Sequence, residues 1–151
     1  MKKIRVYLDN CCYNRPFDDQ NQIRICLESQ AKIHIQNLII CGRIELVFSY
    51  MSVLENSDNP NRENSIVIAD FFRHAILYVD PNQASMIEKS AERIQTQNIK
   101  NKDAIHIACA IDGQCDYFIT TDDGILKKFK EKSIMVCSPI DFVTIFEADD
   151  A

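Results

Sequence analysis

Four carboxylate residues lie where a carboxylate could do chemistry. Asp9 ends the alternating apolar run IRVYLDN, and Asp122 follows the apolar run that leads into ITTDD. Glu55 comes shortly after a second apolar run, IELVFS, and Asp103 lies where the first turn of a helix is expected. An ionisable group that ends a core strand is costly unless it is paired, hydrated or bound to metal. Asp9 therefore indicates a functional site.

The other acids each have an ordinary structural explanation when taken alone. Asp103 could be a first-turn acid, Asp122 or Asp123 an N-cap, and Glu55 a solvated helix residue. If Asp9, Glu55, Asp103 and Asp122 converge, their repulsion would raise some pKa values and destabilise the fold unless divalent cations neutralise them. Carboxylate ligation suits Mg²⁺ or Mn²⁺ better than zinc. The chemistry that follows is metal-assisted attack of water at phosphorus, which is phosphodiester hydrolysis.

The elements that must position these acids alternate between strand and helix along the chain. The expected strands span 4–8, 44–49, 75–79, 117–119 and 133–137, and the expected helices span about 22–41, 50–57, 62–74, 81–97, 101–113 and 139–146. This alternation predicts an α/β fold with a mostly parallel sheet and helices on both faces. Because ligands bind outside the carboxyl ends of such strands, the four acids could meet in one crevice.

Composition indicates one folded domain without bulk affinity for duplex nucleic acid. The chain has 151 residues, of which 46% are hydrophobic and 26% charged, so it can bury a core. No repeat or Gly/Ser linker interrupts it, so we expect one domain over residues 1–147 and a frayed tail over 148–151. A net charge of −5 and a pI of about 5.1 oppose coating of a duplex, although a local nucleic-acid site remains compatible with them.

The cysteines and the apolar runs bear on compartment. Seven cysteines contain no C-x-x-C pair that would suggest zinc or redox chemistry, so we expect reduced and mostly buried thiols. Charged residues interrupt the first apolar run too early for a signal peptide, and no run reaches membrane-spanning length. We therefore expect a cytoplasmic protein without a membrane partner.

Four segments of the chain contain the candidate acids and nearby polar residues. They are YLDN at the first strand, FSYMSVLEN with Ser49 six residues before Glu55, KDAIHIACA around Asp103, and DYFITTDD with Thr120 two residues before Asp122. Together they resemble the PIN-domain nucleases, and more narrowly the VapC-like toxins of bacterial toxin–antitoxin pairs. The resemblance extends from Val6 to about Phe129. Each motif is weak alone, but four in the expected order and spacing are specific.

The resemblance implies a three-layer α/β/α fold with a central sheet of about five strands. It also implies an endoribonuclease that depends on Mg²⁺ or Mn²⁺, an RNA substrate, a cognate antitoxin protein and a homodimer. The catalytic and metal-binding acids would be Asp9, Glu55, Asp103 and Asp122, with Asp123 as an auxiliary metal ligand. Asn10 and Thr120 would orient a carboxylate or the metal's water shell. One or two bound ions would then activate water for attack on the scissile phosphate.

Several residues near the acids allow two interpretations. Arg15, Lys102 and Lys127 could contact RNA phosphates, but lysines on short helices often form a solvated face, and Arg15 could pair with a nearby aspartate. His106 lies one helical turn after Asp103 and could be a metal ligand, an acid–base group or a hydrogen-bonded helix residue.

The segment after Asp9 departs from the general pattern of the family. Cys11 and Cys12 are paired, and the CYNRPFDD stretch is long for a connection between a strand and a helix. Such segments are often functional, so this one could distinguish a subfamily with its own substrate.

Other classes of protein are also compatible with parts of the pattern. One alternative is a catalytically silent PIN-like module that binds RNA or protein, which retention of all four acids opposes. A haloacid-dehalogenase-type phosphatase would need a second aspartate two residues after Asp9, where this chain has Cys11. The three glycines are too few for a phosphate-binding loop.

Overall fold

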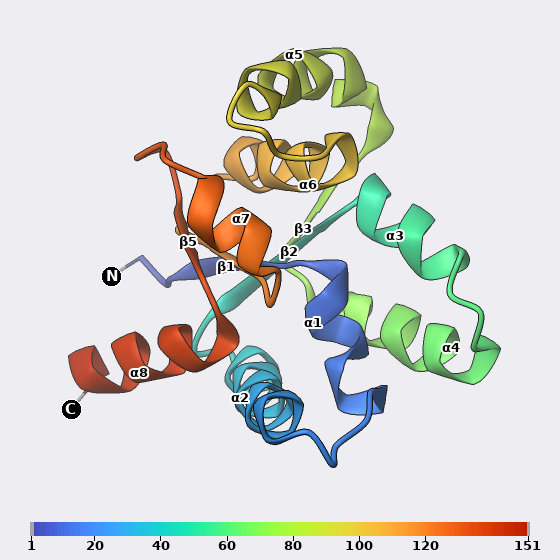
Figure 1. The fold of residues 1–151 in the computed structure, drawn as a ribbon, viewed down its shortest axis with the longest axis vertical. Helices are drawn as coiled ribbons and strands as arrows, with labels where there is room; N and C mark the ends of the chain where they lie inside the picture. The colour runs from blue at the N-terminus through green and yellow to red at the C-terminus, as the bar shows by residue number, and fades with distance from the viewer. Residues whose placement is uncertain (1, 151) are drawn as a thin grey trace.

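A five-stranded parallel sheet crosses the middle of the molecule in the computed structural model, which describes residues 2–150 (Figure 1). The strand order is β3-β2-β1-β4-β5, and helices cover both faces, so the predicted three-layer α/β/α arrangement is confirmed. The strands are β1 (Arg5–Leu8), β2 (Glu45–Ser49), β3 (Leu77–Val79), β4 (Tyr117–Ile119) and β5 (Met135–Cys137).

Strand β1 lies at the centre because both of its faces are apolar. Val6 and Leu8 pack into the core on one side of the sheet, and Tyr7 packs into the core on the other side. Strands of parallel sheets are buried on both faces in this way. The chain adds β2 and β3 on one side of β1 and β4 and β5 on the other, so the strand order reverses beside β1. The carboxyl ends of β1 and β4 therefore flank the crevice where such folds bind ligands.

Two groups of helices cover the sheet (Figure 1). Helix α6 (Asn101–Asp112) packs on the face that contains Tyr7, and α5 (Ala84–Gln95) packs against α6 (Figure 1). The opposite face is covered by α2 (Ile23–Ile40), α4 (Arg62–Phe71) and α8 (Pro139–Asp150). Two shorter helices, α3 (Tyr50–Ser57) and α7 (Asp123–Lys128), begin directly after β2 and shortly after β4. They therefore start at the carboxyl edge of the sheet, where the acids are expected.

The segment after Asp9, expected to be a connection, is helical. It forms α1 (Asn10–Asn14) and the 3-10 turn η1 (Arg15–Phe17). Asp9 begins this helix by accepting a hydrogen bond from the Asn10 amide, and Cys12 and Tyr13 are buried against the sheet and α4. The burial of these two side chains explains why the chain coils here. The other two 3-10 turns are η2 (Phe72–His74) and η3 (Pro81–Gln83).

The last helix extends beyond its expected end. Helix α8 continues through Asp150, so residues 148–150 are helical where a frayed tail was expected, and residue 151 lies outside the described residues. Phe142 and Phe146 pack into the core, and the Glu147 carboxylate lies 2.8 Å from His34 Nε2 on α2. This contact ties the last turns of α8 to the body of the domain.

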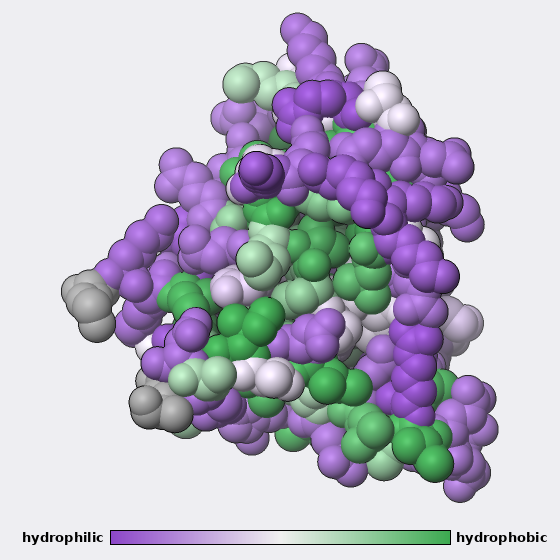
Figure 2. Space-filling model, turned by 60° about the vertical axis from the view of Figure 1, so that its left-hand side comes forward, coloured by the Kyte–Doolittle hydropathy of each residue, from purple (hydrophilic) through white to green (hydrophobic). Residues whose placement is uncertain are grey.

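One face of the molecule has an uncovered apolar area. Figure 2 shows hydrophobic side chains gathered across the middle of this face, within a frame of hydrophilic ones. Large apolar residues that remain exposed include Met135 on the edge strand β5 and Ile140 on α8.

Among residues 2–150, no helix is long and apolar enough to cross a bilayer.

We expect Gly113→Ala to destabilise the fold by about 1–3 kcal/mol, because the added methyl overpacks the contact between α6 and β2. A Cβ on Gly113 would lie 2.9 Å from Val47 Cγ1. Thermal unfolding of Gly113→Ala, Val47→Ala and the double variant measures this. The double variant should lose less stability than the two single losses added together, since Val47→Ala makes room for the methyl. Additive losses would contradict a steric origin.

Candidate metal centre

Asp9 is a buried carboxylate at the end of β1. Its amide donates to the Ile119 carbonyl at 2.9 Å, which extends the pairing of β1 with β4. Its Oδ1 accepts from the Asn10 amide at 2.8 Å, and its Oδ2 accepts from the Thr120 hydroxyl at 2.8 Å. The side chain is only 5% exposed, so these bonds replace most of its hydration.

Thr120 connects Asp9 to Asp122. Its Oγ1 donates to Asp9 and accepts from the Asp122 amide at 3.1 Å. Asp122 then caps α7, because its Oδ1 accepts from the amides of Gly124 and Ile125 at 2.8 and 3.3 Å. One buried hydroxyl therefore sets the orientation of the first acid and the position of the second.

Asp103 lies in the first turn of α6 and faces Asp122. Both line a hollow of about 220 Å³, together with Lys100 and Lys128. The free amides and the dipole of the α6 N-terminus favour a negative charge at this position. The hollow therefore has two carboxylates and two lysines on its walls.

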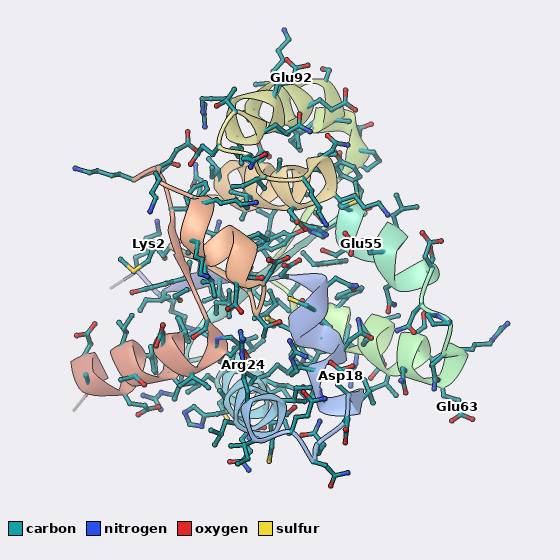
Figure 3. All side chains as sticks on the ribbon, in the orientation of Figure 1. Lys2, Asp18, Arg24, Glu55, Glu63 and Glu92 are labelled. Atoms are coloured by element: carbon teal, nitrogen blue, oxygen red, sulfur yellow. The ribbon has the colours of Figure 1, made fainter. Side chains whose placement is uncertain are left out.

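Glu55 comes to the site from α3 and hydrogen-bonds to α6 (Figure 3). Its Oε1 lies 2.7 Å from His106 Nε2, and His106 Nδ1 lies 2.6 Å from the Tyr7 hydroxyl. Glu55 and Asn10 line a second hollow of about 400 Å³. Of the interpretations open for His106, the geometry shows a fully buried, hydrogen-bonded helix residue.

The four acids influence one another electrostatically. Burial, together with the charges of Asp9, Asp122 and Glu55, raises the pKa of Asp103 to about 6, against the opposing effect of His106. Burial also acts to raise the pKa of Glu55, but the hydrogen bond from His106 and its electrostatic influence, helped by Lys102, lower it below its ordinary value. The crevice thus concentrates negative charge around Asp103.

Asp123, expected as an auxiliary metal ligand, instead forms an ion pair with Arg24 of α2. Both Asp123 oxygens lie 2.8 Å from the Arg24 guanidinium, which lowers the pKa of Asp123 (Figure 3). Arg24 also contacts the buried Glu28 at 3.3 Å. The i, i+4 spacing of Arg24 and Glu28 is visible in the sequence, but their link to Asp123 is not.

The basic residues expected to contact RNA lie in different surroundings. Arg15 donates to Thr121 Oγ1 at 2.8 Å and pairs with Asp18 and Glu28 at 3.1 and 3.3 Å, so it belongs to the same ion network as Arg24. Lys102 and Lys127 are exposed. The effect of Lys102 on the Glu55 pKa places its charge near the acids, whereas Lys127 acts on Asp123.

Four carboxylates are the kind of ligands that a hard divalent cation prefers, although they are not arranged here as ligands of one ion. Among residues 2–150, no group of three or more His, Cys, Asp or Glu side chains is arranged to hold a metal ion. Hydrogen bonds from Thr120, His106 and the α7 amides engage three of the acids instead. Burial and then repulsion from the neighbouring acids raise the pKa of Asp103, and a cation would relieve the repulsion.

Comparison with known proteins decides the family. The PIN domain family model matches residues 6–132, a span that includes all four acids. The chain belongs to the PIN-domain family. Its fold is also similar to that of a chain in the crystal structure of VapBC2 from Rickettsia felis bound to a DNA fragment from their promoter. The two share 12% sequence identity with a TM-score of 0.58, over 89% of this chain and 98% of the other. No curated protein sequence matches the chain.

In this PIN domain, we expect Asp103→Asn to stabilise the metal-free protein on the order of 1 kcal/mol at pH 7.5, after allowance for solvent screening. Because the folded-state pKa of about 6 exceeds the ordinary 3.8, the folded protein binds the proton more tightly. The destabilisation from Asp103 therefore grows as pH rises from about 4 to 6 and persists above that range.

Thermal unfolding in EDTA at pH 4, 5, 6 and 7.5 measures this difference. Glu92→Gln, on the exposed surface of α5 (Figure 3), is the matched control and should change stability little at any of these values. An Asp103→Asn stabilisation that is equal at pH 4 and pH 7.5 would mean that the fold does not raise the pKa of Asp103.

Proposed function

We propose that this PIN domain is a divalent-metal-dependent endoribonuclease that hydrolyses RNA phosphodiester bonds, and that it acts as a VapC-like toxin. The supporting observation is the electrostatic coupling of Asp9, Glu55, Asp103 and Asp122 beside the strand-order reversal. Repulsion of this kind is destabilising without a cation, so a purely structural role does not explain it.

In this proposal, the four acids bind Mg²⁺ or Mn²⁺. The bound ion supplies an activated water and neutralises charge on the leaving oxygen. Thr120 keeps Asp9 oriented by donating to Oδ2, and the α7 amides keep Asp122 in place. Asp123 stays outside the ligand set, because Arg24 occupies both of its oxygens. Arg24 and Asp123 thereby fix the start of α7.

The substrate would bind across the two hollows that flank the acids. Lys100 and Lys128 line the smaller hollow and are placed to contact phosphates, and Lys102 adds a positive charge near Glu55. Asn10 and Asn59 line the larger hollow and offer amide groups to bases or sugars. We assign Arg15 a structural role in the ion network instead of direct RNA contact.

The proposed partners follow from the structural similarity. The R. felis structure contains VapBC2 with promoter DNA. A similar fold supports pairing of this chain with an antitoxin protein, and we propose a homodimer in the cytoplasm as the toxin's working form. The alternative, a silent PIN-like binding module, retains the fold without the metal chemistry.

We expect purified protein to cleave a structured RNA pool with Mg²⁺ or Mn²⁺ and not in EDTA, and Asp9→Asn to reduce the rate at least about a hundredfold. Asp9→Asn preserves size and removes the charge of the most buried of the four site acids. End-labelled RNA resolved by electrophoresis measures cleavage, and calorimetric titration with Mn²⁺ measures metal binding separately. Glu92→Gln serves as the active control.

Two results would decide against the proposal. If the wild type shows no measurable heat of Mn²⁺ binding and leaves the RNA intact, the silent binding module is favoured. Cleavage that continues in EDTA, or equally in Asp9→Asn, would indicate a contaminating nuclease or a different site.

A further inference from the structure

A network of buried polar groups extends from Glu55 into the core of the domain. The Tyr7 hydroxyl lies 2.6 Å from His106 Nδ1, 2.6 Å from Ser49 Oγ and 3.0 Å from Ser52 Oγ. Tyr7, His106 and Ser49 are all 0% exposed, and Ser52 is 3% exposed. This network joins β1, β2, α3 and α6. Glu55 is partly exposed, whereas the other members of the network are buried. A buried network of this kind is costly unless every member is satisfied.

One assignment of protons satisfies every group in this network. Ser49 Oγ accepts from the amides of Met51 and Ser52, and Ser52 Oγ accepts from the Ser49 amide, so both hydroxyls are free to donate to Tyr7. Tyr7 then donates its own proton to His106 Nδ1, and His106 Nε2 donates to Glu55. All donors therefore point toward the carboxylate.

We propose that Tyr7 and His106 are positioning residues that fix the Glu55 carboxylate, so that the affinity of the acidic site for its cation depends on a hydroxyl buried in the core. This inference rests on the proposed function, since it concerns the same metal site. Both His106 nitrogens are engaged, which leaves neither for a metal or a proton transfer with substrate. His106 therefore acts through Glu55.

The connection also explains why Glu55 needs such a partner. Asp9 and Asp122 are oriented by Thr120 and by backbone amides close to them in the chain. Glu55 lies in the last turn of α3, and its side chain hydrogen-bonds to His106, 51 residues away. Without His106, its carboxylate would be free to turn away from the other acids. Groups that orient metal ligands typically change affinity about 10- to 100-fold.

We expect Tyr7→Phe to weaken Mn²⁺ binding about 10- to 100-fold, although Tyr7 does not contact the cation. The probe is Mn²⁺ alone, with free Mn²⁺ measured by electron paramagnetic resonance at a temperature well below the midpoint of unfolding. Tyr13→Phe is the matched control, because it removes another buried phenol hydroxyl. Tyr13 packs on the opposite face of the sheet, and its hydroxyl has no hydrogen-bond partner among residues 2–150. Its Mn²⁺ affinity should equal that of wild type.

Two substitutions of His106 separate positioning from packing. His106→Gln retains a donor near the Nε2 position that faces Glu55, whereas His106→Asn retains polar atoms near Nδ1 that face Tyr7. We expect His106→Gln to bind Mn²⁺ more tightly than His106→Asn, although both remove the ring. Equal affinities in the two variants would overturn the proposal.

A double-mutant cycle tests whether Tyr7 acts through Glu55. In a Glu55→Gln background, Tyr7→Phe should have little further effect on Mn²⁺ affinity. An equal loss in both backgrounds would overturn the proposal, because it would mean that Tyr7 acts through Asp9 on the same strand.

The titration also separates this inference from the proposed function. If wild type binds Mn²⁺ and Tyr7→Phe folds and binds it equally well, only the positioning role fails. If wild type binds no Mn²⁺, the proposed function and the positioning role both fail.

Discussion

Repulsion among four carboxylates at one edge of a sheet is the constraint on which the architecture of this domain depends. Each acid is brought to the edge by a different element, so the fold itself forces like charges together. Three of them are held by dedicated donors: Thr120 for Asp9, the α7 amides for Asp122, and His106 for Glu55. The remaining strain falls on Asp103, whose pKa is raised to about 6.

The scaffold resists this repulsion through rigid connections on both sides of the crevice. The central position of β1 fixes Asp9 between β2 and β4, and apolar side chains on both faces prevent the strand from shifting. On the α2 side, Arg24 pairs with Asp123 and with the buried Glu28, which fixes the start of α7 and hence Asp122. The exposed Arg24–Asp123 pair alone would contribute little, but its link to a buried acid gives it a defined geometry.

The sequence was sufficient to predict the fold and the approximate placement of the acids, because these depend on local patterns. Apolar runs that end in Asp9 and before Asp122 identify strand ends, and parallel strands align those ends at one edge. Side-chain direction depends on partners distant in sequence, which local patterns do not contain. Local patterns therefore place Asp123 beside Asp122 as an auxiliary metal ligand, and they do not contain its pairing with Arg24, 99 residues away.

The partners of Glu55 illustrate the same limit. Tyr7 alternates with apolar residues as any strand residue would, and His106 is compatible with three roles when its neighbours are unknown. Their contact spans 99 residues, and it exists because β1 lies under α6 in the folded chain. Likewise, the helical turns after Asp9 depend on burial of Cys12 and Tyr13 against elements formed later in the chain. Packing decided both features.

In the proposed function, the arrangement also links catalysis to stability. Acids that repel one another reduce the stability of the metal-free fold, and any cation that binds them returns that free energy through mass action. The hydrogen-bond donors limit this reduction in stability, but they leave the carboxylates charged. That charge is what can attract a cation. Among residues 2–150, no donor is hydrogen-bonded to the Asp103 carboxylate, so Asp103 is the acid most free to respond when charge enters the crevice. If the proposed function holds, the strain that remains at Asp103 is what would make the site receptive to a cation.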